Sequence, residues 1–209
     1  MRILAFAFVL AGLFAPGPVF AQAGNNTAVL NPNLAEADEL AALPHMNAGL
    51  VQLIADGRPF LGMPSLDEKL KGALSDDQRA ELYGKLFLPI NLNTASEAEI
   101  MLIPGMSGRM AHEFEEYRPY TSLEQFRREI GKYVDADEVA RFEQYIFIPI
   151  NLNSASSADF ATIPGMSRRM VHEFEEYRPY KDLDQFRREI GKYVDEGEVA
   201  RLERYVTLD

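Results

Sequence analysis

Residues 103–109 read Ile-Pro-Gly-Met-Ser-Gly-Arg, and residues 163–169 read Ile-Pro-Gly-Met-Ser-Arg-Arg. The two stretches lie 60 residues apart, and the similarity extends around them, because residues 91–149 and 151–209 are identical at 40 of 59 positions. A diverged copy precedes them at the same offset, with Leu43-Pro44-His45-Met46 at the turn. A period of this size predicts tandem supersecondary units. The chain accordingly divides into a first repeat (31–90), a second repeat (91–150) and a third repeat (151–209).

Each repeat is expected to contain four short helices. In the second repeat, Thr94 with Glu97 forms a capping-box pattern, and this predicts a helix that ends at Pro104-Gly105. Ser122 and Asp135 (with Glu138) are expected to cap later helices, and the same box recurs as Asp195 with Glu198 and as Ser75 with Gln78. Apolar residues at helical spacing predict buried faces made of Met110, Phe114 and Tyr117; of Leu123, Phe126 and Ile130; and of Val139, Phe142 and Ile146.

The predicted fold class is all-α, with three four-helix units in series. Residues 147–150, Phe-Ile-Pro-Ile, are expected to form a short extended link between repeats. Since the repeat is regular, we also expect each unit to form its own small core, with few contacts between distant units.

The first 21 residues have the pattern of a cleaved secretory signal. Met1-Arg2 is a short positive start, residues 3–14 are an apolar run too short to span a bilayer, and Val19-Phe20-Ala21 offers small residues to a signal peptidase. Residues 22–30 then form a polar lead. The mature protein is therefore expected to be soluble and to be periplasmic or secreted.

Composition excludes several classes of protein. The 209 residues include 32 acidic and 21 basic side chains, giving a net charge of −11, which opposes coating of nucleic acid by bulk charge. Loss of Arg2 with the signal makes the mature chain −12 (20 basic against 32 acidic residues). Cysteine is absent, so disulfides, thiolate zinc sites and a cysteine nucleophile are excluded.

The second repeat contains four motifs in order: Asn-Leu-Asn-Thr-Ala-Ser from Asn91, the Pro-Gly turn, Tyr-Arg-Pro-Tyr ending at Tyr120, and the Leu-Glu-Gln-Phe helix. With these motifs, the repeat resembles the helix-hairpin-helix module of the ComEA family. The resemblance covers all three repeats, and the first is degenerate. It implies an exported protein that binds duplex DNA without reading bases, by holding phosphate on hairpin amides and a helix N-terminus. The residues that match this phosphate site are Gly105, Met106, Ser107, Gly108 and Arg109, with Gly165, Met166, Ser167, Arg168 and Arg169.

The chain departs from the family pattern at several points. Serine replaces the second hairpin glycine at Ser107 and Ser167, and His45 replaces the first in the first repeat. All three repeats are net acidic, with 5 basic against 9 acidic residues, 6 against 11, and 9 against 12. In the third repeat, the basic residues that could form a local basic face are Arg168, Arg169, Lys181, Arg187, Arg188 and Lys192.

Two functions therefore remain open from the sequence. One is weak, sequence-independent binding of double-stranded DNA, narrowly favoured because the hairpin is kept twice. The alternative is an acidic protein-interaction or scaffold module on the same fold, with a basic envelope protein as partner. The direction of the arginines, toward the hairpin or toward carboxylates such as Glu124 and Asp184, discriminates between them.

Catalysis has no candidate site in the sequence. His112 and Glu116 could chelate a metal at i, i+4, but no third ligand lies near. Glu113, Glu115 and Glu116 are more simply interpreted as an exposed acidic stripe. We therefore predict a protein that is not an enzyme and that has no metal site and no cofactor.

Overall fold

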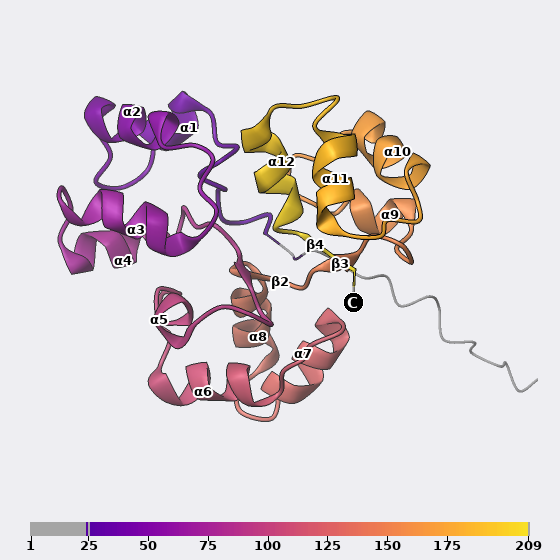
Figure 1. Cartoon of the computed structure of the whole chain (residues 1–209). Helices are drawn as coiled ribbons and strands as arrows, with labels where there is room; N and C mark the ends of the chain where they lie inside the picture. Colours follow the sequence, from indigo (N-terminus) through magenta and orange to yellow (C-terminus); the bar gives the residue numbers. More distant parts are fainter. Residues whose placement is uncertain (1–23, 25, 209) are drawn as a thin grey trace, which may run out of the picture.

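The structure is a computed structural model that describes Gly24 and residues 26–208, and these residues are mostly helical (Figure 1). The proposed signal segment lies outside the described residues. Within the described part, no helix has the length and apolar character needed to cross a membrane. Four helices occur in each repeat: α1 (Ala37–Ala41), α2 (Ala48–Asp56), α3 (Met63–Lys71) and α4 (Asp76–Tyr83); α5 (Glu97–Ile100), α6 (Gly108–Glu116), α7 (Leu123–Ile130) and α8 (Ala136–Glu143); α9 (Ser157–Phe160), α10 (Arg168–Glu176), α11 (Leu183–Ile190) and α12 (Glu196–Glu203).

Side-chain caps set the helix starts, and most of the predicted caps are confirmed. Ser122 accepts from the Gln125 amide, and Ser75 forms a full capping box with Gln78. Asp135 accepts from the Glu138 amide, but the Glu138 side chain pairs with Arg141 instead of returning to the cap. Asp195 and Glu198 behave in the same way, with Arg201 as the partner.

The predicted cap at Thr94 is wrong. Helix α5 begins at Glu97, and its cap is Ser96, whose hydroxyl accepts from the Glu99 amide at 3.2 Å. The amides of Thr94 and Ala95 instead donate to the Asn91 carbonyl, so residues 91–95 form a turn before the helix starts.

Two-residue strands close the second and third repeats, in addition to the predicted helices. Strand β1 (Ile90–Asn91) pairs in parallel with β2 (Ile146–Phe147), and β3 (Ile150–Asn151) pairs in parallel with β4 (Val206–Thr207). A single parallel bridge, Leu30 to Leu86, closes the first repeat at the equivalent positions. Ile146 is buried as expected, but in a strand, because α8 ends at Glu143. The beginning and end of every repeat therefore lie side by side.

A second contact, repeated in all three copies, ties the start of each repeat to its middle. In the second repeat the Asn93 side chain accepts from the Tyr120 amide at 2.7 Å and donates to the Tyr120 carbonyl at 2.9 Å. The Arg118 guanidinium donates to the carbonyls of Leu92 and Ala95 at 2.7 and 2.6 Å. Arg58 and Arg178 make the equivalent bonds. The Arg-Pro segment thus anchors the Asn-x-Asn turn from within the repeat.

The predicted helical faces are buried, but the cores are not three separate ones. Leu123, Phe126 and Ile130 are buried, as are Met110, Phe114, Val139 and Phe142, while Tyr117 is half-buried. The buried side chains of the first two repeats form one continuous cluster, which corrects the expectation of independent cores. The third repeat has its own cluster, which also includes Phe147 from the preceding link.

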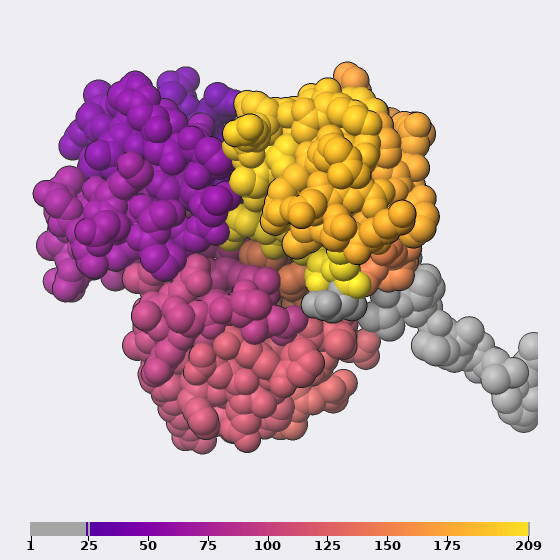
Figure 2. All heavy atoms as spheres, viewed as in Figure 1, coloured from indigo at the N-terminus to yellow at the C-terminus, as the bar shows by residue number. Residues whose placement is uncertain are grey.

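The repeats form three lobes around a centre, and the third lobe contacts the first (Figures 1 and 2). Leu34 of the first repeat lies against Gly165, and Pro59 lies against Gly197 of α12. A Cβ added at Gly197 would lie 3.2 Å from Pro59 Cδ. The positions equivalent to Gly197 carry Asp77 and Asp137. The third repeat therefore carries its smallest residue at the point where the first repeat approaches it, which corrects the expectation of few contacts between distant units.

Candidate functional site

The Pro-Gly turns have the backbone conformation that their glycines predict. Gly105 has φ +73° and Gly165 has φ +75°, a left-handed region that a Cβ disfavours. In both turns the methionine amide, of Met106 or Met166, donates 3.0 Å to the isoleucine carbonyl three residues earlier. Both turns therefore favour a residue without a Cβ at this position.

The first repeat keeps this turn without glycine. His45 occupies the equivalent position with φ +63°, the one left-handed non-glycine residue in the described part of the chain. Its Nε2 lies 2.7 Å from Glu81 Oε2. In the other repeats, the residue equivalent to Glu81 is an arginine, Arg141 or Arg201, and it donates 2.6 Å to the carbonyl of Pro104 or Pro164. The C-terminal helix therefore braces the hairpin in every copy, a role that sequence analysis missed.

Serine caps the helix that follows each glycine turn. Ser107 Oγ accepts from the Met110 amide at 3.2 Å, and Ser167 Oγ accepts from the Met170 amide at the same distance. These hydroxyls satisfy one amide of each helix start that a bound phosphate would otherwise use. The two preceding helical residues, Gly108 and Arg109 in α6, are exposed, and their amides have no intrahelical acceptor.

The arginines beside the turns are exposed, and their surroundings differ. The Arg109 guanidinium lies 6.0 Å from the Tyr133 ring centre, and that of Arg169 lies 5.5 Å from Tyr193 and 3.9 Å from a Glu173 oxygen. Arg168 makes no side-chain hydrogen bond or ion pair to another residue among those described. Among the predicted residues, Gly105, Ser107, Gly108 and Arg109 thus come together at one exposed turn, and Gly165, Ser167, Arg168 and Arg169 at another. Met106 is instead buried in the core and Met166 packs against the core of the third repeat, so neither methionine faces a ligand at the turn.

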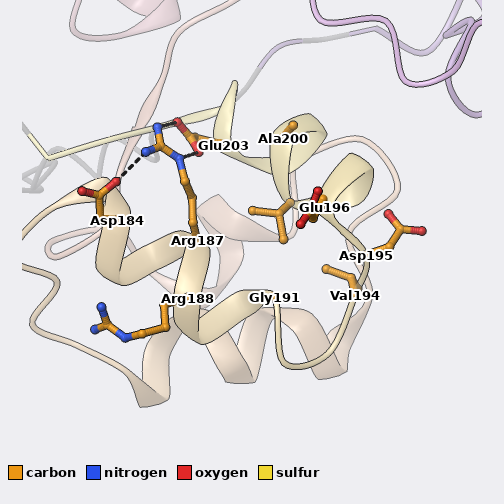
Figure 3. A pocket seen from close by; sticks show the side chains of 10 residues that line it. Asp184, Arg187, Arg188, Gly191, Val194, Asp195, Glu196, Ala200 and Glu203 are labelled. Carbon is orange, nitrogen blue, oxygen red and sulfur yellow. Dashed lines mark hydrogen bonds and ion pairs between the residues drawn. The ribbon is translucent and has the colours of Figure 1, made fainter.

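The arginine pairs on α7 and α11, the third helices of the second and third repeats, each direct one arginine to a carboxylate on the following helix. Arg187 is held between Asp184, at 2.7 Å, and Glu203 on α12, with which it makes two hydrogen bonds (Figure 3). Arg127 bonds both carboxylate oxygens of Glu143, at 2.6 and 2.8 Å, and this hydrogen bonding raises the pKa of Arg127. The expected partner Asp184 is therefore confirmed, whereas for Arg127 the carboxylate comes from α8 and not from Glu124.

The remaining members of the expected basic face are also paired, apart from Arg168 and Lys181. Lys192 and Arg188 both bond Glu189, just as Lys132 and Arg128 bond Glu129. Hydrogen bonds from these cations lower the pKa of both carboxyl groups. The Lys181 side chain makes no ion pair within the described residues. Four of the six residues of the expected basic face, Arg169, Arg187, Arg188 and Lys192, are thus paired with carboxylates of the third repeat.

The histidine pairs lie at the surface. His112 Nε2 lies 3.6 Å from Glu116 Oε2, and His172 Nε2 lies 3.4 Å from Glu176 Oε2. In the described residues no third histidine or carboxylate joins either pair to form a possible metal site. Glu113 was expected on an exposed stripe, but it is buried, because α6 turns this side chain toward its own repeat.

The chain matches no protein-family model, no curated protein and no solved structure.

Proposed function

We propose that the chain is an exported, non-enzymatic binding protein, made of three tandem helix-hairpin-helix units of the ComEA type, that binds a basic protein at the cell envelope. The single observation that carries this proposal is the pairing of its arginines. Arg127 and Arg187 bond carboxylates of their own repeat instead of facing the hairpin turns. Such bidentate pairs fix both groups and leave little positive charge for a polyanion.

The overall charge supports the same conclusion. The mature chain carries −12, and exposed carboxylates such as Asp135 and Asp137 remain unpaired by any basic side chain in the described residues. A field of this sign repels nucleic acid at long range and steers a positively charged protein toward the surface.

A column carrying the mature chain and loaded with envelope extract tests this proposal. Retained proteins should be basic and should elute as salt rises, because exposed charge attraction is screened. The matched variant changes Asp135 and Asp137 to Asn, which preserves the helix cap while removing two charges. Equal retention on the wild-type and variant columns at every salt concentration would argue against charge-steered binding.

Duplex DNA binding is the second candidate, and one observation favours it. Gly105 and Gly165 both keep the left-handed turn in front of exposed helix-start amides, and Arg168, beside one of them, has no ion-pair partner among the described residues. Gel retardation of duplex DNA should then weaken with salt, by about 0.9 in log affinity per log salt for each phosphate neutralised. Changing Arg168 and Arg169 together to Ala should flatten this slope by roughly one to two units. Absence of retardation at low salt would exclude this candidate.

A further inference from the structure

A groove of about 720 Å³ lies between the second and third repeats, beside β3 and β4. Thr94 and Thr121 line it from the second repeat, and Pro149, Ser154, Asp159 and Thr207 line it from the link and the third repeat. Its walls therefore combine apolar surface with several hydrogen-bonding groups.

Asp159 in this groove is a buried carboxylate with one oxygen unused. Only 6% of the residue is exposed. Its Oδ2 accepts from the Ser156 amide at 2.7 Å and from the Ser156 hydroxyl at 2.8 Å. Its Oδ1 has no hydrogen-bond partner among the described residues. A buried acceptor without a donor is costly, so a donor brought to this oxygen by a ligand would be favoured.

The chain itself fills the equivalent place between its first two repeats. The carbonyl of Pro89, 60 residues before Pro149, accepts 2.8 Å from the Arg204 guanidinium at the end of α12. Arg204 also lies 5.5 Å from the Phe147 ring centre and 5.3 Å from that of Tyr205. Burial lowers the pKa of Arg204, and the Glu99 carboxylate, which is equivalent to Asp159, acts in the opposite direction. The first junction is therefore completed by an arginine near a carboxylate.

The Glu99 and Asp159 side chains differ in length and therefore in the groups they contact. Glu99 Oε1 accepts from the Met63 amide of the preceding repeat at 3.2 Å. Asp159 is one methylene shorter, and it makes no bond to the equivalent amide, that of Leu123. The Pro149 carbonyl likewise receives no hydrogen bond from the part of the chain that the structure describes. Two acceptors that are occupied or neutralised at the first junction thus lack a donor at the second within the described residues.

We propose that this groove binds an arginine side chain of a basic partner protein, with the guanidinium donating to the Pro149 carbonyl and to Asp159 Oδ1. Arginine fits better than lysine, because its planar fork reaches two separate acceptors at once. A second copy of the chain that continued the repeat packing would place Gly84 or Gln144 at the position of Arg204. Neither is a cation, so a second copy packed in this way would supply no guanidinium, and the occupant that we propose is a different, basic protein. This inference rests on the proposed protein binding and gives the chemistry of the partner.

Two-dimensional NMR of the mature chain titrated with acetyl-arginine amide tests the proposal, with the neutral citrulline analogue as the matched ligand. We expect saturable shifts at Thr94, Ser154 and Thr207 for the arginine compound alone. Asp159→Asn keeps the acceptor toward Ser156 and replaces the unused oxygen with a donor, so affinity should fall about tenfold or more. Glu99→Gln, at the junction already filled by Arg204, should bind as the wild type does.

A second variant tests the groove independently of Asp159, and its melting temperature shows whether the fold is retained. Ser154 is exposed, so Ser154→Phe should obstruct the groove while the melting temperature stays near that of the wild type. Absent saturation, equal binding of the citrulline analogue, or unchanged affinity in Asp159→Asn would overturn the proposal. Self-association that Asp159→Asn abolishes would make the occupant a second copy and would also overturn it. If the NMR titration is negative but the column still retains basic envelope protein, the proposed function stands and only the assignment of the groove as the arginine site fails.

Discussion

Substitution of Gly165 by Ala probes the hairpin and the contact between the first and third repeats together. The backbone there has φ +75°, and an added Cβ would lie 2.9 Å from Leu34 Cδ2. Gly105 is the matched control, because its φ is +73° and its Cβ would lie 3.6 Å from Arg141 Nη2, an ordinary contact. The two variants therefore share the backbone strain and differ in the Leu34 contact between repeats. They differ as well in the distance to the bracing arginine, because the Cβ at Gly165 would lie 3.2 Å from Arg201 Nη2.

The magnitudes follow from these two contributions. A left-handed alanine costs about 1–2 kcal/mol, and the stiffer unfolded chain returns about 0.4–1 kcal/mol, so each variant should lose roughly 1 kcal/mol from the backbone alone. Displacing Leu34 adds about 1 kcal/mol in Gly165→Ala, at the lower end of overpacking costs because this side chain is 38% exposed and can move. A difference of about 1 kcal/mol corresponds to roughly 2–4 °C in melting temperature for a chain of this size.

Denaturant and thermal unfolding measure the effect in wild type, Gly105→Ala, Gly165→Ala, and Gly165→Ala combined with Leu34→Ala. Leu34→Ala alone completes the double-mutant cycle, and a coupling energy of about 1 kcal/mol is expected between the two sites. Equal losses for the two glycine variants, or a coupling energy near zero, would refute the contact between the first and third repeats.

Three further predictions follow from the described contacts. A fragment of residues 147–208 should melt cooperatively by circular dichroism, whereas residues 151–208 should melt at a lower temperature, because Phe147 belongs to the core of the third repeat and packs 4.6 Å from Tyr205, centre to centre. Arg178→Ala should lower the free energy of unfolding by about 1.5–3 kcal/mol, since two backbone carbonyls lose their charged donor, while the exposed Arg188→Ala should change it by less than about 0.5 kcal/mol. Hydrogen bonds from Arg141 lower the pKa of Glu138, so the stability from this pair is present above the ordinary carboxyl pKa and is lost as pH falls through the lowered value. Melting temperatures between pH 6 and pH 3 should therefore drop less in Glu138→Gln than in wild type.

Local signals in the sequence predicted most of the elements. Pro-Gly at a helix end specified the left-handed turns, and Ser122 and Ser75 were recognisable caps, because each depends on residues within one or two helical turns. The strands were missed because two residues are too few to show an alternating pattern. The partner of Arg127 was missed because Glu143 lies 16 residues away on another helix.

The packing of the repeats against one another was harder to predict from the sequence than the helices were. It is marked only at positions where the three copies differ. Leu34 is replaced by Thr94 and Ser154 in the other repeats, and Gly197 replaces Asp77 and Asp137. Both exceptions lie at the contact between the first and third repeats. A repeated sequence defines the unit, and departures from the repeat mark where one unit meets another.

The parallel bridges that close each repeat determine how the chain would respond to tension. In the second repeat the chain enters at the start of β1 and leaves at the end of β2, and the two strands run in the same direction. Pulling on the two ends of the protein would slide these strands past each other and load their evenly spaced hydrogen bonds together instead of one by one. A protein held at one end and pulled at the other would meet this shear resistance at each repeat in turn.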